Sequence, residues 1–312
     1  MIDDSCKIFK NEVKAALESA FTLAREAFDE TGKDVLDPNV KDLIGHLYGK
    51  DAGNLRAARK FLDAISSRVP QRETRDVIDV NDVRIFCDLS RWEHRKVFDE
   101  EFLLDTIMDS TLPEDDEDWN NCNDPNGDLD AYVTNFPLRR GQVVKESYIQ
   151  FCGRYLKQVR DQDPRLVQDM TDWEKWKNMP VKVVEKLQAW RGKTKVPIDA
   201  LVLFDVVTVH ELSHLRTAGY TKDRSPGGLS GMLKYNSPYG WTNCVKLSGD
   251  ARSCEDAENV MFLALGVRLI KNGVGIKKSG ALTDANNGRG ASGEGAGEGE
   301  GKGKGKDSGG PA

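Results

Sequence analysis

Apolar residues recur with a helical period along much of this chain. Between Lys7 and Phe28 they lie three and four residues apart, which predicts an amphipathic helix that ends near Gly32. The segment before His210 is instead apolar on nearly all sides, and a helix of that composition is buried. We predict this buried helix over residues 198–216. The same periodicity predicts further helices over residues 40–48, 52–65, 181–190, 241–247 and 254–270.

Short runs of β-branched and aromatic residues predict a few strands. They cover residues 76–80, 83–87 and 147–151. Few strands among many helices predict a mostly helical α+β fold, with a small twisted sheet beside the buried helix. At 312 residues with 38% hydrophobic content, the chain can form one large domain or two small lobes.

Charge and composition narrow the partners and the extent of the domain. A formal net charge of −6 gives no sign of a basic patch for nucleic acid, and no apolar run reaches the ~18 residues of a membrane span. We therefore expect neither a nucleic-acid nor a membrane partner. We also expect a monomer. From Asn272, and above all from Gly280, glycine becomes frequent and later alternates with Glu and Lys. Such a sequence cannot offset its ordering entropy, so we predict a domain over residues 1–271 and a disordered tail over residues 272–312.

The buried helix carries the motif His210-Glu211-Leu212-Ser213-His214. Residues four apart lie on one helix face, so both imidazoles can bind one zinc ion at about 2.0–2.1 Å. Glu211 would lie near the open position of the metal, where zinc lowers the pKa of bound water to about 7. A carboxylate there can take the proton of the water and later pass it to the leaving amine. The motif therefore predicts a zinc protease site with Glu211 as general base and then acid.

Zinc needs a third protein ligand, and the sequence offers three candidates. A metzincin would have Gly and His where this chain has Thr217 and Tyr220, so that class is excluded. No histidine follows His214, which favours a carboxylate. The candidates are Asp223, which follows a turn at Gly219, and Glu255 or Glu258 on a later helix.

Four short motifs in this region resemble one family. They are His210-Glu211-x-x-His214, Thr221-Lys222-Asp223, Tyr239-Gly240 and Asp256-Ala257-Glu258-Asn259. Together they resemble the deuterolysin-type aspzincin metallopeptidases, especially the fungal peptidyl-Lys metalloendopeptidases, over residues 207–265. The resemblance implies a zincin-like fold and a zinc-dependent endopeptidase that cleaves protein or peptide substrates, with Lys favoured on the leaving-group side.

The resemblance also assigns roles to individual residues. It implies that His210, His214 and Asp223 hold Zn²⁺. Tyr239 would donate a hydrogen bond to the oxyanion formed during hydrolysis. Glu258 stands where the family has Asp, and it would lie in the pocket that recognises a basic side chain. The alternative for Glu258 is an exposed charge on the surface of its helix.

One departure from the family pattern leaves alternatives open. Residues 224–238 precede Tyr239, where the family has only a few residues, so Tyr235 and Tyr220 remain alternatives for the oxyanion role. Within this insertion, residues 225–231 form either a flap over the cleft or a variable surface loop.

Six cysteines and the start of the chain bear on localisation. For a secreted relative of this family we expect three disulfides, Cys6–Cys87, Cys122–Cys152 and Cys244–Cys254, and the alternative is six reduced thiols. The first residues contain neither a basic region nor an apolar stretch, so the chain as given shows no signal peptide. Because Cys6 falls where a processed family member would begin, we interpret the chain as a mature extracellular form.

Two competing interpretations apply to the motif itself. The first treats His210 and His214 as interior histidines bonded to carbonyl groups, which leaves the costly carboxylate of Glu211 in an apolar segment unexplained. The second is a non-catalytic secreted zincin-fold antigen or zinc-binding module. The intact Glu211 argues against it, because a module needs only the ligands.

Other polar features favour structural roles. The acidic segment over residues 115–130 fails the EF-hand spacing, so a solvated loop is favoured over a calcium site. His46 and His94 are isolated in the sequence, which favours packing or surface roles. Serine- and cysteine-based catalytic triads find no support.

Overall fold

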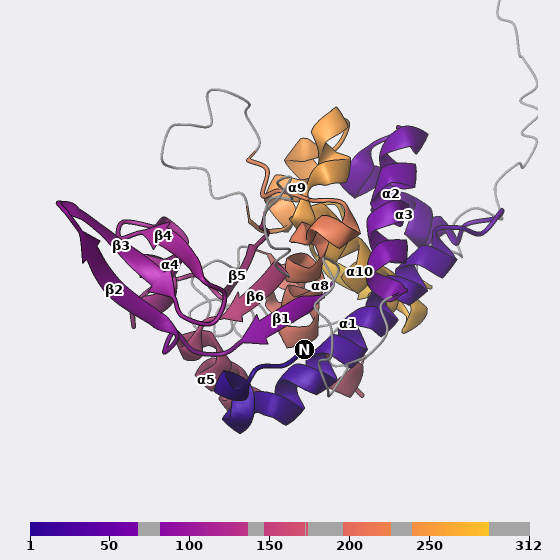
Figure 1. Cartoon of the computed structure of the whole chain (residues 1–312). Coiled ribbons are helices and arrows are strands. Elements are labelled where there is room, and N and C mark those ends of the chain that lie inside the picture. Colours follow the sequence, from indigo (N-terminus) through magenta and orange to yellow (C-terminus); the bar gives the residue numbers. More distant parts are fainter. Residues whose placement is uncertain (68–81, 137–146, 172, 174–195, 226–238, 287–312) are drawn as a thin grey trace, which may run out of the picture.

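The computed structural model describes residues 1–67, 82–136, 147–171, 173, 196–225 and 239–286. Helices make up most of this part of the chain (Figure 1). The α-helices are α1 (Lys10–Glu30), α2 (Pro38–Tyr48), α3 (Ala52–Ser66), α4 (Glu117–Asn123), α5 (Gly153–Asp161), α8 (Phe204–His214), α9 (Trp241–Leu247) and α10 (Ala257–Lys271). Short 3₁₀ helices are η1 (Asp4–Phe9), η2 (Val167–Asp169), η3 (Pro197–Leu201), η4 (Arg216–Ala218) and η6 (Ala251–Glu255).

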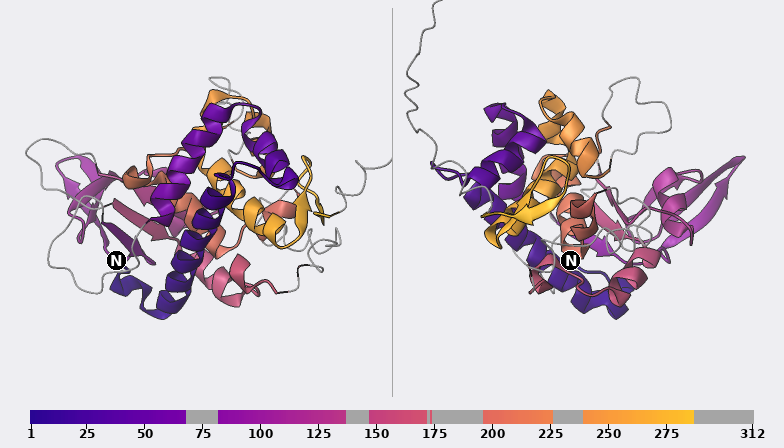
Figure 2. Two further views of the ribbon diagram at one scale, coloured as in Figure 1. Left: turned by 90° about the vertical axis from the view of Figure 1, so that its right-hand side faces the viewer. Right: turned by 180° about the vertical axis from the view of Figure 1, so that it is seen from behind.

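Helices α8 and α10 lie at the centre of the helical part of the molecule. Every residue of α8 from Phe204 to Ser213 is buried, and α10 is buried from Ala257 to Val267. Helices α1 and α3 pack against both, and α2 packs against α10 (Figures 1 and 2). Helix α1 can approach closely because it turns small residues to the core, including Ala16, Ala20, Ala24 and Ala27. The nearly all-round apolar pattern of α8 and α10 follows from this central position.

A three-stranded sheet lies beside α8, as the sequence predicts. It consists of β1 (Val83–Phe86), β6 (Ser147–Phe151) and β5 (Ala131–Thr134), in the order β1-β6-β5. Strand β6 pairs parallel with β1 and antiparallel with β5, and all of its residues are buried. Strand β5 stands at one edge of this sheet and packs against α8.

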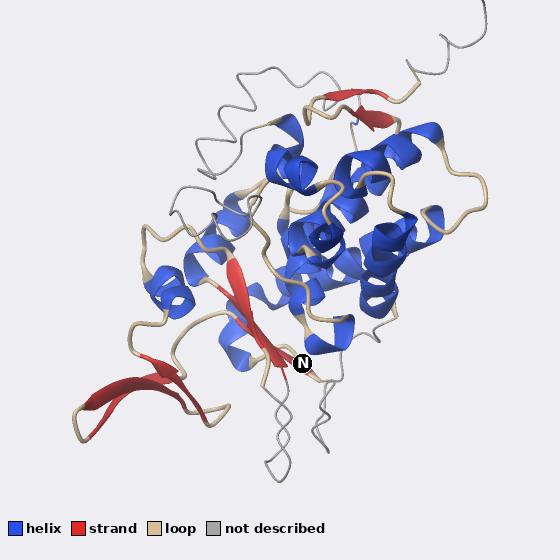
Figure 3. Cartoon of the chain, turned by 90° about the horizontal axis from the view of Figure 1, so that it is seen from above, coloured by secondary structure: helices blue, strands red, loops and turns tan. Residues whose placement is uncertain are grey.

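A second antiparallel sheet, which sequence analysis missed, projects away from the helices (Figures 1 and 3). It is formed by β2 (Trp92–Val97), β3 (Glu100–Asp105) and β4 (Ser110–Pro113). Its base is fixed by a buried ion pair in which Arg91 Nε donates to Asp105 Oδ2 at 2.6 Å. Beyond Trp92 the residues of β2 are exposed on both faces, so they show no apolar alternation from which a strand could be predicted.

The ordered domain extends further than predicted at its C-terminal end. Strands β7 (Val274–Ile276) and β8 (Leu282–Asp284) form an antiparallel hairpin that packs against α10. The boundary at residue 271 is therefore too early. Backbone pairing and the burial of Val274 and Leu282 order this segment despite its glycines. Residues 287–312 of the predicted tail lie outside the described residues.

The helix predicted over residues 198–216 is divided into η3, α8 and η4. Leu203 has an extended backbone, and the amide of Phe204 donates to Arg165 O at 3.1 Å instead of continuing a helix from η3. Leu215 is also extended and ends α8 directly after His214. The predictions for residues 76–80 and 181–190 lie outside the described part of the chain.

Two of the three expected disulfides are confirmed. Cys6 is bonded to Cys87, which follows β1, and Cys122 of α4 is bonded to Cys152 before α5. The third pair is wrong, because Cys244 and Cys254 are free. Cys244 is fully buried in α9, whereas the partly exposed thiol of Cys254 in η6 donates to Ala251 O at 3.1 Å. Two disulfides are compatible with a protein that functions in an oxidising environment.

The remaining polar features are placed on the surface or in packing contacts. Within the acidic segment the chain forms α4, with Asp116 as its N-cap, so this segment is not wholly a loop. His46 packs edge-on against Trp241, and His94 packs against Trp119. Among the described helices, none has both the length and the apolar character that a membrane crossing requires.

Candidate metal centre

Helix α8 brings the two histidines of the motif together. His210 and His214 lie one turn apart, with ring centroids separated by 4.7 Å. Ser213 faces the interior and donates to His210 O at 2.7 Å, which ties down the last turn of the helix. The spacing of the histidines therefore has the effect predicted from the sequence.

A tight turn after α8 returns the chain to these histidines. Gly219 has a φ of +114°, and a Cβ atom there would lie 2.6 Å from Phe61 Cε1, so both backbone conformation and space require glycine. Thr221 closes the turn: its amide donates to Ser213 O at 3.2 Å, and its hydroxyl lies 2.7 Å from Ser213 Oγ. This turn places Asp223 beside the helix.

The start of α10 holds the backbone on both sides of Asp223. Before it, Lys222 exchanges hydrogen bonds with the backbone of the α10 region: its amide donates to Glu255 O at 2.8 Å, and its carbonyl accepts from Ala257 at 3.2 Å. After it, the Arg224 amide donates to the carboxylate of Asp256 at 2.9 Å. Asp223 is therefore fixed by a segment more than thirty residues away in sequence, which no local pattern could reveal.

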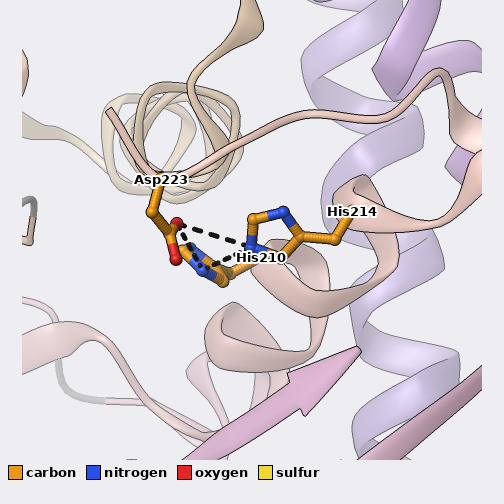
Figure 4. Close-up of side chains that lie close together, drawn as sticks. All are labelled: His210, His214 and Asp223. Atoms are coloured by element: carbon orange, nitrogen blue, oxygen red, sulfur yellow. Dashed lines mark hydrogen bonds and ion pairs between the residues drawn. The ribbon is translucent and has the colours of Figure 1, made fainter. Parts of the chain in front are cut away.

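Three potential ligand atoms converge at this point (Figure 4). His210 Nε2 lies 3.0 Å from His214 Nε2, and Asp223 Oδ1 lies 3.2 and 3.4 Å from these two nitrogens. Ligands that bind zinc tetrahedrally at about 2.0–2.1 Å are themselves about 3.3 Å apart. The spacing of the three atoms therefore fits one face of a zinc coordination tetrahedron.

The opposite sides of the imidazole rings also fit a metal site. His214 Nδ1 lies 2.9 Å from Thr221 O, and because a carbonyl only accepts, this nitrogen carries the proton. His210 Nδ1 lies 3.3 Å from Glu258 Oε1, at ion-pair distance but without hydrogen-bond geometry, and the negative charge of the carboxylate favours a proton on this nitrogen. Both Nε2 atoms can then offer lone pairs to a cation that is shared with Asp223. This set of donors suits a cation, and histidines so oriented are typical of zinc centres.

The pKa shifts within the cluster also favour a bound cation. Desolvation would raise the pKa of Asp223, but the adjacent histidines outweigh it and hold the pKa well below the usual value. Burial would lower the pKa of His210 and of His214, yet Asp223 outweighs burial and raises both. The surroundings that favour a proton on these rings also favour a metal cation in its place.

Glu211 lies beside this cluster but does not belong to it. It is 5% exposed and lines the same cavity as the three potential ligands. Burial raises the pKa of Glu211 to about 7, although His210 and His214 oppose the shift. A carboxyl group with this pKa can both accept and release a proton near neutral pH.

Tyr239, which directly precedes Gly240, also contacts the cluster. Its hydroxyl donates to Asp223 Oδ2 at 3.0 Å, and burial together with the charge of Asp223 raises its pKa, so the phenol stays protonated. Tyr220 also lines the cavity and is 47% exposed, whereas Tyr235 lies outside the described residues. Most of the 225–231 segment also lies outside them.

The two other acidic candidates for the third ligand occupy different positions. Glu255 is exposed and forms a surface ion pair with Arg224 at 2.6 Å. Glu258 lies in the site with a side chain that is 9% exposed, so it is not a surface charge, and it contacts the Nδ1 side of His210. Neither joins the His210, His214 and Asp223 cluster within the described part of the chain.

The cluster opens into a cavity of about 410 Å³. Strand β5 contributes part of its wall, and three acidic residues that sequence analysis did not select also line it: Asp118, Asp130 and Asp199. The acidic segment of the sequence contained the signal for the first two, but only the fold shows that they face the histidines.

No family model, curated protein or solved structure matches this chain. The resemblance to aspzincins therefore rests on the four motifs alone.

Proposed function

We propose that this protein is an extracellular zinc-dependent endopeptidase of the aspzincin type. The observation that carries the proposal is the tetrahedral spacing of the ligand atoms of His210, His214 and Asp223, with the buried carboxyl group of Glu211 beside them. The two disulfides support a location outside the cytosol.

The residues of the site can divide the work of peptide hydrolysis. Bound zinc would polarise the scissile carbonyl and lower the pKa of a water molecule to about 7. Glu211 would accept a proton from the attacking water and return it to the leaving amine, a role that suits its buried position beside the three potential ligands. The protonated phenol of Tyr239 would donate a hydrogen bond to the oxygen on which negative charge develops.

The cavity also offers a place for an extended peptide. Strand β5 is at the edge of its sheet, and Ala131, Tyr132 and Val133 line the cavity. A substrate backbone could add to this edge as a further strand. Asp118 and Asp130 on the cavity wall would favour a substrate with basic side chains, in keeping with the Lys preference that the resemblance implies.

The proposal is tested by hydrolysis of casein and Lys-containing peptides in the presence of zinc. Because Glu211→Gln removes the proton acceptor and leaves the three ligands in place, we expect zinc binding to persist and the rate to fall at least about a thousandfold. Cleavage sites mapped by mass spectrometry should be enriched before Lys. Zinc binding without hydrolysis in either protein would favour the non-catalytic zinc-binding module.

A further inference from the structure

Glu258 is an acidic residue in a position where a free carboxylate would be costly. It lies in the first turn of α10, two residues after the N-cap Asp256. The side chain of Asp256 accepts a hydrogen bond from the amide of Asn259 at 3.0 Å. The side chain of Glu258 is 9% exposed. A carboxylate taken out of water in this way is stable only with specific partners, so its partners indicate its role.

Each oxygen of Glu258 lies against a different part of the site. Oε1 lies 3.3 Å from His210 Nδ1, on the side of the ring opposite the ligand atom. Oε2 accepts a hydrogen bond from the amide of Gly240 at 3.0 Å. One carboxylate thus contacts both a potential zinc ligand on α8 and the backbone next to Tyr239.

A second carboxylate holds the same turn from the other side. Asp199 accepts from the amide of Trp241 at 2.8 Å, directly after the amide that Glu258 binds. Gly240 between them has a φ of +95°, a conformation that favours glycine. The turn that directs Tyr239 toward Asp223 is therefore held by two buried acidic side chains.

We propose that Glu258 is a positioning residue that orients His210 for zinc and, through Gly240, holds Tyr239 in the site. This inference rests on the proposed function and changes the role that the family resemblance assigns to Glu258, recognition of a substrate Lys. A carboxylate on the far nitrogen of a histidine ligand fixes its tautomer and raises its basicity, and loss of such a partner typically weakens metal binding 10–100-fold.

The test compares Glu258→Gln with Glu255→Gln, a matched change on the exposed neighbouring carboxylate. Zinc affinity is measured by competition with a chromophoric chelator, and the cobalt-substituted proteins are compared by visible absorption. Because the neutral amide removes the negative charge beside His210 Nδ1, we expect a roughly 10–100-fold higher zinc Kd and an altered cobalt spectrum. Glu255→Gln should match the wild type in both.

A measurement on the wild type covers the case in which Glu258→Gln does not fold. In long-range ¹H–¹⁵N NMR spectra of the zinc-loaded protein, His210 should carry a slowly exchanging proton on Nδ1. A His210 proton on Nε2, or a rapidly exchanging Nδ1 proton, would overturn the inference.

The outcomes separate this inference from the proposed function. If folded Glu258→Gln keeps the zinc Kd and cobalt spectrum but loses discrimination between Lys and Leu peptides, Glu258 recognises substrate and the inference is wrong. If Glu258→Gln weakens zinc binding while the wild type hydrolyses no peptide, the inference stands and the peptidase proposal fails. Failure of the wild type to bind zinc would overturn both.

Discussion

The two halves of α8 each bury a carboxyl group, and their surroundings differ. Asp205, in the first turn, is fully buried, and it accepts from Ser19 Oγ at 2.6 Å and from the amide of Val167 at 2.9 Å. Glu211, near the other end, is 5% exposed and lies beside His210. Burial raises the pKa of Asp205 to about 6 and that of Glu211 to about 7.

The comparison shows that burial and a raised pKa do not by themselves identify a catalytic group. The partners of Asp205 are scaffold groups from α1 and η2, so its carboxyl group ties three elements together. Glu211 instead faces a cavity and is surrounded by groups that suit a metal. The neighbours of a buried carboxyl group, and its access to a cavity, separate a structural role from a chemical one.

The largest effect that would sharpen this contrast is expected at Asp223. Asp223→Ala removes one of three ligands, so zinc affinity should fall by more than about a thousandfold. Glu255→Ala changes an exposed carboxylate nearby and should leave the affinity unchanged. Chelator competition measures both. Zinc that is retained in Asp223→Ala but lost in Glu255→Ala would show that the cluster is not the metal site.

A smaller effect is expected at Tyr239. Tyr239→Phe removes a single hydrogen-bond donor, so kcat should fall by about a hundredfold or more while KM and zinc content stay near wild type. Steady-state kinetics on a Lys-containing peptide provide the measurement. Tyr220→Phe is the control within the described chain. A near-normal rate in Tyr239→Phe, together with a collapse in Tyr220→Phe or Tyr235→Phe, would move the oxyanion role.

The third effect concerns Asp205 and should appear in stability, with none in catalysis. Its folded-state pKa of about 6 is above the usual 3.8, so the protonated group favours the folded state at low pH. That contribution is lost as pH rises from about 4 through 6 and is on the order of 3 kcal/mol at most. Asp205→Asn should reduce this slope in urea unfolding of the metal-free protein. An unchanged slope would assign the pH dependence to other groups.

Local patterns predicted the helices whose apolar residues form either one face or a continuous buried run. Residues 241–247 form α9 as predicted, and α10 closely follows the predicted helix over residues 254–270. Strand β2 was missed because its exposed residues show no apolar alternation, and β3 because its apolar residues are a run of only three, Phe102 to Leu104, which has no strand period. The 272–286 segment was assigned to the tail because its glycines conceal a short hairpin.

Some residues of the candidate site could likewise be predicted from the sequence, and others could not. His210 and His214 could be predicted because helical geometry alone fixes their relation. The choice of Asp223 over Glu255 depends on the turn at Gly219 and on backbone bonds to the start of α10, which are tertiary. The contacts of Glu258 with His210 and Gly240 likewise join three separate segments, so its place behind the metal ligand could not be derived from sequence spacing.

The most direct test of the central claim, that one end of α8 is a catalytic zinc site, is a zinc titration of the metal-free protein with peptide hydrolysis as the readout. Our account predicts that the rate rises linearly to one equivalent of zinc and then levels off. Glu211→Gln should bind the same single equivalent without gaining activity. Hydrolysis that is independent of zinc, or equal in Glu211→Gln, would contradict the account.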